Sequence, residues 1–72
     1  MYMILITFHT TAEAFEFERA CKQQNIEGRL ATIPRSISAG CGFAWKAPES
    51  QRSLLFALIN ENHMEYEGVH EL

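Results

Sequence analysis

The chain contains no aspartate and has few glycines (four) and prolines (two). None of the glycines belongs to a glycine-rich phosphate loop ahead of a helix. No serine lies on a recognisable nucleophile elbow, so a Ser-His-acid catalytic set is not indicated. An enzyme of 72 residues would therefore need a partner to supply the missing groups. The sequence favours a carrier or a binding module, without turnover of its own, over an enzyme.

Cysteine and histidine are also scarce. Cys21 and Cys41 are the only thiols, whereas small secreted folds that depend on disulfides usually carry about four cysteines or more. A zinc site needs about four ligands, usually grouped in close pairs, and the three histidines are scattered along the chain. The sequence predicts no disulfide framework, no metal and no cofactor.

Neither charge nor hydropathy indicates a nucleic-acid or membrane partner. The 6 Lys and Arg residues against 9 acidic residues give a net charge of -3, which supplies no basic field for a phosphate backbone. The apolar run at residues 1–8 is much shorter than the roughly 18 residues that span a bilayer, and no basic n-region or cleavage site accompanies it. With 47% apolar residues, we expect one cytoplasmic globular domain spanning residues 1–72.

The spacing of apolar residues predicts alternating strands and helices. Residues 2–8 are rich in β-branched and aromatic side chains, as in a central strand, and Thr10 to Glu13 has the Thr-x-x-Glu spacing of a helix start. The expected elements are strands at 2–8, 29–33, 41–46 and 66–72 and helices at 10–24 and 48–62. This order is typical of an α+β, ferredoxin-like βαββαβ sandwich. Right-handed crossovers then give a four-stranded antiparallel sheet of order 4-1-3-2 with both helices on one face.

Each expected helix has one apolar stripe that faces the sheet. The inward positions are Ala14, Phe17, Ala20 and Cys21 in the first helix and Gln51, Leu54, Leu55, Leu58 and Ile59 in the second. Phe15 and Phe56 lie off these stripes. The other sheet face is left bare, so we expect Met3 and Leu5, or their register mates, to meet solvent or a second subunit, which favours a homodimer. Single exposed apolar residues are also ordinary in monomers, so the oligomeric state stays open.

The predicted topology brings Cys41 together with several polar groups. The end of the first strand, the connection at residues 34–40 and the end of the second helix meet at the sheet edge where Cys41 stands. The first helix and the end of the second add further side chains to this edge, namely His9, Thr10, Thr11 and His63. We therefore take this edge as the candidate site.

A cysteine acts as a nucleophile or a carrier through its thiolate, which helix N-termini, histidines and arginines stabilise. Gly40 and Gly42 leave the sulfur unshielded and let backbone N–H groups face an anion. The other groups that could bind this anion are the hydroxyls of Ser36 and Ser38 and the guanidinium of Arg35. The alternative is a structural Cys41, because free cysteine is often buried and a Gly-Cys-Gly run also marks a bulge or the tight start of a strand.

Four segments carry a resemblance to a known family. They are the strand at 2–8, the helix start Thr10-Thr11-Ala12, the segment 33–42 with its Pro-Arg-x-Ile-Ser-x-x-Cys-Gly core, and residues 66–70. With these segments the chain resembles, over nearly its whole length, the selenium/sulfur carrier-like proteins, which are small bacterial domains. The Cys-Pro-x-Pro helix start of other small sulfur-transfer proteins is absent. The similarity to those proteins therefore concerns the expected role and not this motif.

The resemblance implies a carrier that holds sulfur or selenium as a persulfide or perselenide on Cys41. Such a carrier takes the atom from a donor enzyme and passes it to an acceptor protein, with Gly42, Ser38 and Arg35 around the loaded sulfur. The rival prediction is a ferredoxin-like interaction or oligomerisation module in which Cys41 is structural. Capture of a soft metal by the Cys41 thiols of two subunits is a weaker alternative, because one thiol per chain makes an incomplete site.

Overall fold

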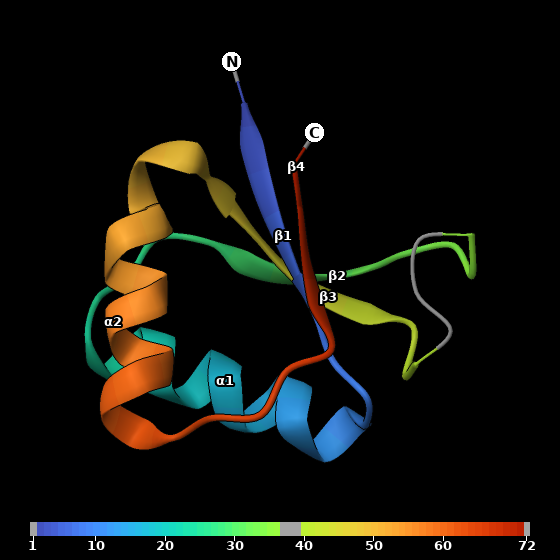
Figure 1. Ribbon diagram of the computed structural model, residues 1–72, viewed down its shortest axis with the longest axis horizontal. Helices are drawn as coiled ribbons and strands as arrows, with labels where there is room; N and C mark the ends of the chain where they lie inside the picture. The colour runs from blue at the N-terminus through green and yellow to red at the C-terminus, as the bar shows by residue number, and fades with distance from the viewer. Residues whose placement is uncertain (1, 37–39, 72) are drawn as a thin grey trace.

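Four strands form one antiparallel sheet, and two helices cover one of its faces (Figure 1). The computed structural model describes residues 2–36 and 40–71. The elements in chain order are β1 (Met3–Thr7), α1 (Thr11–Gln23), β2 (Arg29–Thr32), β3 (Phe43–Pro48), the one-turn 3-10 helix η1 (Glu49–Gln51), α2 (Arg52–Asn62) and β4 (Gly68–Glu71). The predicted βαββαβ order is confirmed.

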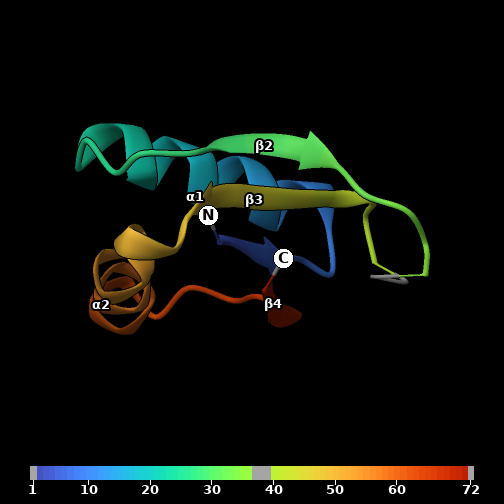
Figure 2. The ribbon, with the colours of Figure 1, turned by 90° about the horizontal axis from the view of Figure 1, so that it is seen from above.

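The strands follow the order β2-β3-β1-β4, which is the predicted order 4-1-3-2 taken from the other edge. Figure 2 shows the four strands side by side, and Figure 1 shows α1 and α2 on the same side of them. β1 pairs antiparallel with both β3 and β4, so the apolar run of this strand lies inside the sheet. Within residues 2–36 and 40–71, no helix has the length and apolar character needed to cross a membrane.

Helix α1 begins at a capping arrangement of the predicted kind. Thr10 is the N-cap, and its hydroxyl accepts the N–H of Glu13 at 3.2 Å. The Glu13 carboxylate reaches back, but it accepts the N–H of His9 (2.8 Å) and also lies 3.3 Å from Nδ1 of the His9 ring. Because the first N–H groups of a helix have no intrahelical partner, these contacts fix the turn between β1 and α1.

The core lies between the helices and the sheet, and aromatic rings fill its centre. The ring centroid of Phe17 lies 5.3 Å from that of Phe8 and 6.0 Å from that of Trp45, distances at which tilted aromatic pairs attract each other. Trp45 is 1% exposed, and its indole N–H has no acceptor within the described part of the chain. The backbone of Gly28 packs against this indole, since a Cβ there would lie 2.5 Å from Nε1.

The inward face of α2 differs from the prediction at Leu54 and Phe56, and Gln51, predicted on this face, lies before the helix in η1. Leu55, Leu58 and Ile59 are buried, but Leu54 is 52% exposed, and Phe56, predicted on the outer side, packs partly buried against the core. Leu54 and Phe56 stand on opposite sides of Leu55, each about 100° away around the helix. Periodicity cannot tell which of these two flanks the rest of the protein covers. In this structure the core packs against the flank of Phe56.

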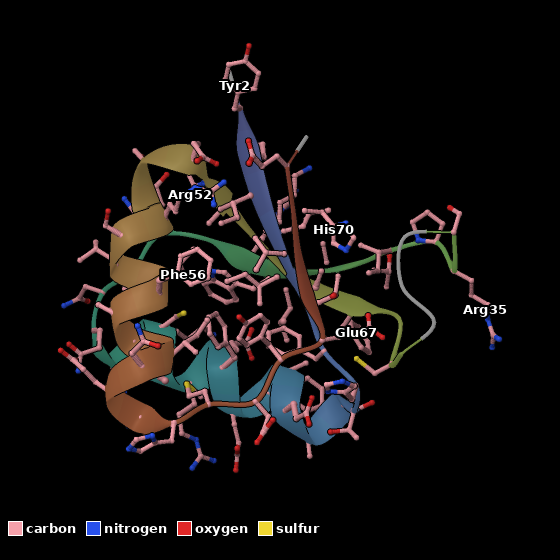
Figure 3. The ribbon with its side chains drawn as sticks, in the orientation of Figure 1. Tyr2, Arg35, Arg52, Phe56, Glu67 and His70 are labelled. Atoms are coloured by element: carbon pink, nitrogen blue, oxygen red, sulfur yellow. The ribbon has the colours of Figure 1, made fainter. Side chains whose placement is uncertain are left out.

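Arg52 joins the start of α2 to the edge strand β4, beside the ring of Phe56 (Figure 3). Its guanidinium forms an ion pair with Glu49 and a second with Glu71, in which Nη2 lies 2.9 Å from Oε1. The hydrogen bond to Glu49 raises the pKa of Arg52, and Glu71 acts in the same direction. These contacts tie the last described residues of β4 to the helix layer.

The second face of the sheet carries no helix or strand among the described residues, yet its centre is covered. Leu5 is 3% exposed, and Thr7 is fully buried. In the strand register Leu5 stands directly between Lys46 of β3 and His70 of β4, and such opposite residues share one face and lie close together. The prediction that Leu5 meets solvent or a second subunit is therefore wrong, because longer side chains flank it on both sides; Met3 is partly exposed.

Candidate functional site

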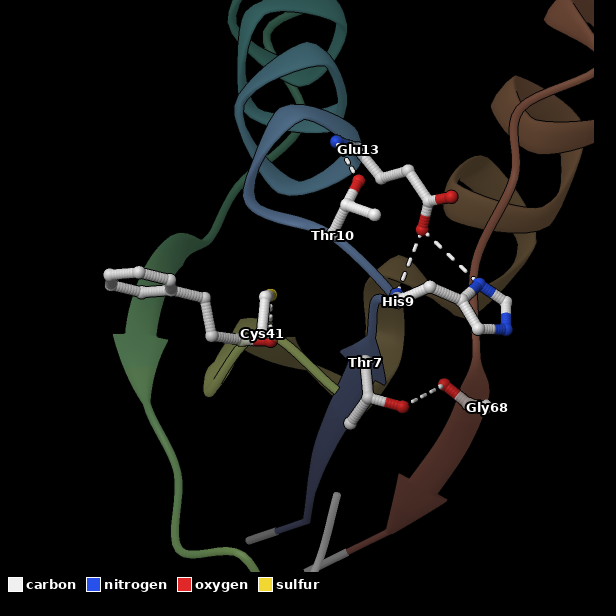
Figure 4. A network of polar contacts seen from close by, with 7 residues as sticks. Thr7, His9, Thr10, Glu13, Cys41 and Gly68 are labelled. Atoms are coloured by element: carbon white, nitrogen blue, oxygen red, sulfur yellow. Dashed lines mark hydrogen bonds and ion pairs between the residues drawn. The ribbon is translucent and has the colours of Figure 1, made fainter. Parts of the chain in front are cut away.

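Cys41 lies just before β3, where the chain returns to the end of β1 (Figure 4). Its backbone N–H donates to the carbonyl oxygen of Phe8 at 3.3 Å. Its side chain is half-buried and packs against the core, and the thiol donates to the carbonyl oxygen of Phe43 with a sulfur-to-oxygen distance of 3.8 Å. Cys41 as a residue is therefore neither sealed in the interior nor fully in solvent.

The two glycines beside Cys41 have different backbone roles. A Cβ at Gly40 would lie 2.2 Å from the carbonyl oxygen of Phe8, so only glycine allows this close approach of two backbones. Gly42 has a φ of +85°, in the left-handed region that favours glycine, and a Cβ there would meet no atom within 4 Å. Gly40 thus allows the chain to approach the end of β1 just before Cys41, and Gly42 adopts a left-handed conformation beside open space just after it.

Phe8, whose carbonyl oxygen accepts the backbone N–H of Cys41, lies two residues before Thr10, the N-cap of α1. Thr10 and Thr11 are exposed at this helix start. The His9 ring, in contrast, turns toward the Glu13 carboxylate, and Figure 4 shows it on the other side of the chain from Cys41. The structure therefore brings Cys41 near the predicted helix end, while His9 is engaged with Glu13.

The remaining predicted residues lie farther out. Arg35 and Ser36 are exposed, and Figure 3 shows the Arg35 side chain at the outer end of the connection after β2, pointing away from the body of the protein. Ser38 lies outside the described residues. His63 ends α2 in a left-handed conformation and lines a hollow that Glu13 and Glu16 also line. No contact between His63 and Cys41 is found in the described part of the chain.

Glu67 is a charged residue beside the site that the sequence argument did not include. Its Oε2 lies 3.2 Å from the position of a Cβ on Gly40, and its N–H donates to the carbonyl oxygen of Thr7 at 2.6 Å. Figure 3 places it between the end of β1 and the start of β3. Glu67 and Gly40 are far apart in the sequence, so no local spacing signals their approach. The carboxylate adds a negative charge next to the backbone that leads into Cys41.

The two thiols differ sharply in environment. Cys21 is fully buried on the inner stripe of α1, and this burial raises the pKa of its thiol to about 12. Both cysteines are free. Cys41 is therefore the more exposed of the two thiols. Among residues 2–36 and 40–71, no group of three or more His, Cys or Glu is placed to hold a metal ion.

Comparison with known proteins gives a match to a protein family. A family model described as "Putative Se/S carrier protein-like" matches residues 3–71. No curated protein and no solved structure matches the chain. The matched range includes all four strands, both helices and Cys41.

Proposed function

The chain belongs to the Se/S carrier protein-like family, and on this premise we propose that it holds sulfur or selenium on Cys41 as a persulfide or perselenide and passes the atom to a partner protein. The observation that carries the proposal is the contrast between the two thiols. Cys21 is sealed in the core, whereas Cys41 is half-buried at the surface beside an open glycine.

The transfer proposed is a redox-neutral exchange at sulfur. The Cys41 thiolate attacks the terminal sulfur of a persulfide on a donor enzyme. A new S–S bond forms on Cys41, the S–S bond of the donor breaks, and the donor cysteine leaves as a thiolate. With a perselenide donor, the terminal selenium moves in the same way. An acceptor thiolate then attacks the outer atom, and Cys41 leaves as a thiolate with no net oxidation.

Three features of the site support this chemistry. The start of α1, near Phe8, carries a partial positive charge that favours a nearby anion. Gly42, the residue after Cys41, carries no side chain, and the space beside its Cα is open. Arg35 and Ser36 stand on the exposed connection that leads to Cys41, where they can contact the partner that delivers the sulfur. Ser38, which lies outside the described residues, is proposed from the sequence to bind the same anion through its hydroxyl.

The direct test is the intact mass of the protein after treatment with a small-molecule persulfide. We expect one added sulfur atom per chain, removed by a reductant. Cys41→Ser should abolish this increment, and the matched variant Cys21→Ala should retain it. Loading that persists in Cys41→Ser, or wild-type protein that accepts no sulfur, would contradict the proposal. The alkylation rate of Cys41 as a function of pH gives a second readout, since the carrier requires a reactive thiolate.

The rival function is an interaction module in which Cys41 is structural. The contact of its thiol with the Phe43 carbonyl oxygen and its packing against the core favour this alternative. If Cys41 is a packing residue, its replacement by serine lowers the stability of the protein. If Cys41 is a carrier residue, the replacement abolishes only the loading of sulfur. Urea unfolding of Cys41→Ser therefore separates the two functions, and sedimentation of the wild-type protein tests the homodimer expected from the sequence.

A further inference from the structure

Three basic side chains form a row across the sheet face that points away from the helices. The register places Arg29 of β2 opposite Lys46 of β3, Lys46 opposite Leu5 of β1, and Leu5 opposite His70 of β4. Directly opposite residues project from the same face of a sheet. His70 confirms this direction, because its Nε2 lies 3.7 Å from the position of a Cβ on Gly68, two residues earlier on its own strand.

The positive charges of this row have no acidic partner within it. Neither Arg29 nor Lys46 forms an ion pair with another described residue. Like charges directly opposite each other in a sheet are destabilising, so this cross-strand pair costs stability in the free protein. Two of the six Lys and Arg residues stand in the row, which leaves four against nine Glu in the rest of the chain. The row is therefore a local reversal of the charge of an acidic protein.

The surface around the row can accept another chain. Leu5 is almost fully buried between Lys46 and His70. Ala31 and Ala44, which lie two residues along from Arg29 and Lys46 on their strands, carry only short side chains. A hollow of about 320 Å³ adjoins the two cations and is lined by Met3, Glu27, Gly28, Arg29, Lys46 and Pro48. Glu27 is the one acidic residue on its lining. A carboxylate seated between Arg29 and Lys46 would remove their mutual repulsion.

We propose that this row, made of Arg29, Lys46 and His70, is a docking surface for a short acidic segment of a partner protein. Charge complementarity argues for this occupant, because oppositely charged patches steer association and fix register. A long nucleic-acid strand suits the surface less well, since it would extend beyond three basic side chains onto a molecule of net charge -3. The surface is distinct from Cys41, so its function does not require the proposed sulfur chemistry.

The test is a titration of isotope-labelled protein with an oligoglutamate peptide, followed by NMR. We expect amide shifts to concentrate on β2, β3 and β4 around the row and binding to weaken as salt is added. R29Q/K46Q should raise the apparent Kd about tenfold. The matched control R19Q/K22Q makes the same change in net charge on α1 and should change the Kd by less than about threefold. The spectra themselves report whether each variant is folded, and Lys46→Gln alone gives a milder second variant.

Other outcomes would overturn the proposal. They are shifts spread over all basic residues, equal weakening by both double variants, or tighter binding of a short RNA than of the peptide at the same face. Loading of Cys41 by a small-molecule persulfide should be unchanged in R29Q/K46Q. Failure of peptide docking is therefore distinguishable from failure of the proposed carrier function.

Discussion

The backbone N–H of Cys41 and the carbonyl oxygen of Phe8 are joined by a hydrogen bond of 3.3 Å. This bond links two segments that are far apart in the sequence, the connection before β3 and the end of β1. It holds the backbone of Cys41 two residues from the N-cap of α1, and it requires that the neighbouring residue 40 carry no side chain. The position of the candidate site thus depends on one backbone contact and one glycine.

Gly40→Ala should destabilise the protein by about 1–3 kcal/mol, the range for overpacking. The new Cβ would fall 2.2 Å from the Phe8 carbonyl oxygen, a backbone atom that cannot rotate away. The control is Gly42→Ala, which meets no neighbour and should cost about 1 kcal/mol through its left-handed φ alone. Urea unfolding measures both, and a larger loss in Gly42→Ala than in Gly40→Ala would contradict this account.

The buried thiol of Cys21 predicts how stability responds to alkaline pH. Burial raises its pKa to about 12 from 9.0, so between these values the unfolded chain releases a proton that the folded chain retains. The unfolded state then binds fewer protons, and stability falls as pH rises. The contribution is fully present below pH 9.0 and is lost as pH approaches 12. Chemical denaturation across this window should show a flatter decline in Cys21→Ala, and an identical decline would contradict the assignment.

Thr10→Ala should cost about 0.5–2 kcal/mol, the usual loss on removing an N-cap hydroxyl. Thr10 is the side chain that accepts the N–H of Glu13. The adjacent Thr11, exposed in the first turn of α1, provides the matched control, and Thr11→Ala should leave stability within about 0.5 kcal/mol. Thermal unfolding measures the loss of stability in each variant. Equal losses in Thr10→Ala and Thr11→Ala would contradict a specific contribution of the cap.

Lys46→Glu should stabilise the free protein by about 0.2–1 kcal/mol, because it converts a like-charge cross-strand pair with Arg29 into an opposite-charge pair. Lys22→Glu is the matched control on α1. Lys22 lies 3.8 Å from Glu18 in an ion pair at the end of its helix, so its replacement should destabilise slightly. Opposite signs of the two effects in urea unfolding check the prediction, and a loss of stability in Lys46→Glu would contradict the repulsion inferred here.

The local features of the fold could be predicted from the sequence because they depend on neighbours along the chain. The alternating elements follow from apolar periodicity, and the cap of α1 follows from the spacing of Thr10 and Glu13. The carboxylate of Glu13 accepts the N–H of His9, the residue before the N-cap Thr10. Periodicity also could not decide whether the flank of Leu54 or that of Phe56 is covered, since both are equally far from the centre of the stripe.

The candidate site could be predicted only in part because its neighbours come from different elements. The topology places Cys41 near the end of β1, and the hydrogen bond to Phe8 agrees with that placement. The direction of a side chain in an irregular connection has no period to follow, and Arg35 points outward (Figure 3). The approach of Glu67 to Gly40, and the alignment of Arg29 with Lys46, depend on strand pairing that the sequence alone does not specify.

The lone tryptophan in this chain offers a built-in optical probe. Its indole is almost fully buried against the ring of Phe17, and its ring nitrogen donates to no acceptor in the portion of the chain that the structure describes. Fluorescence from such an indole should be emitted at short wavelength and move to longer wavelength once water reaches it. Variants of the thiol, the glycines and the basic row can therefore be compared without attaching any dye.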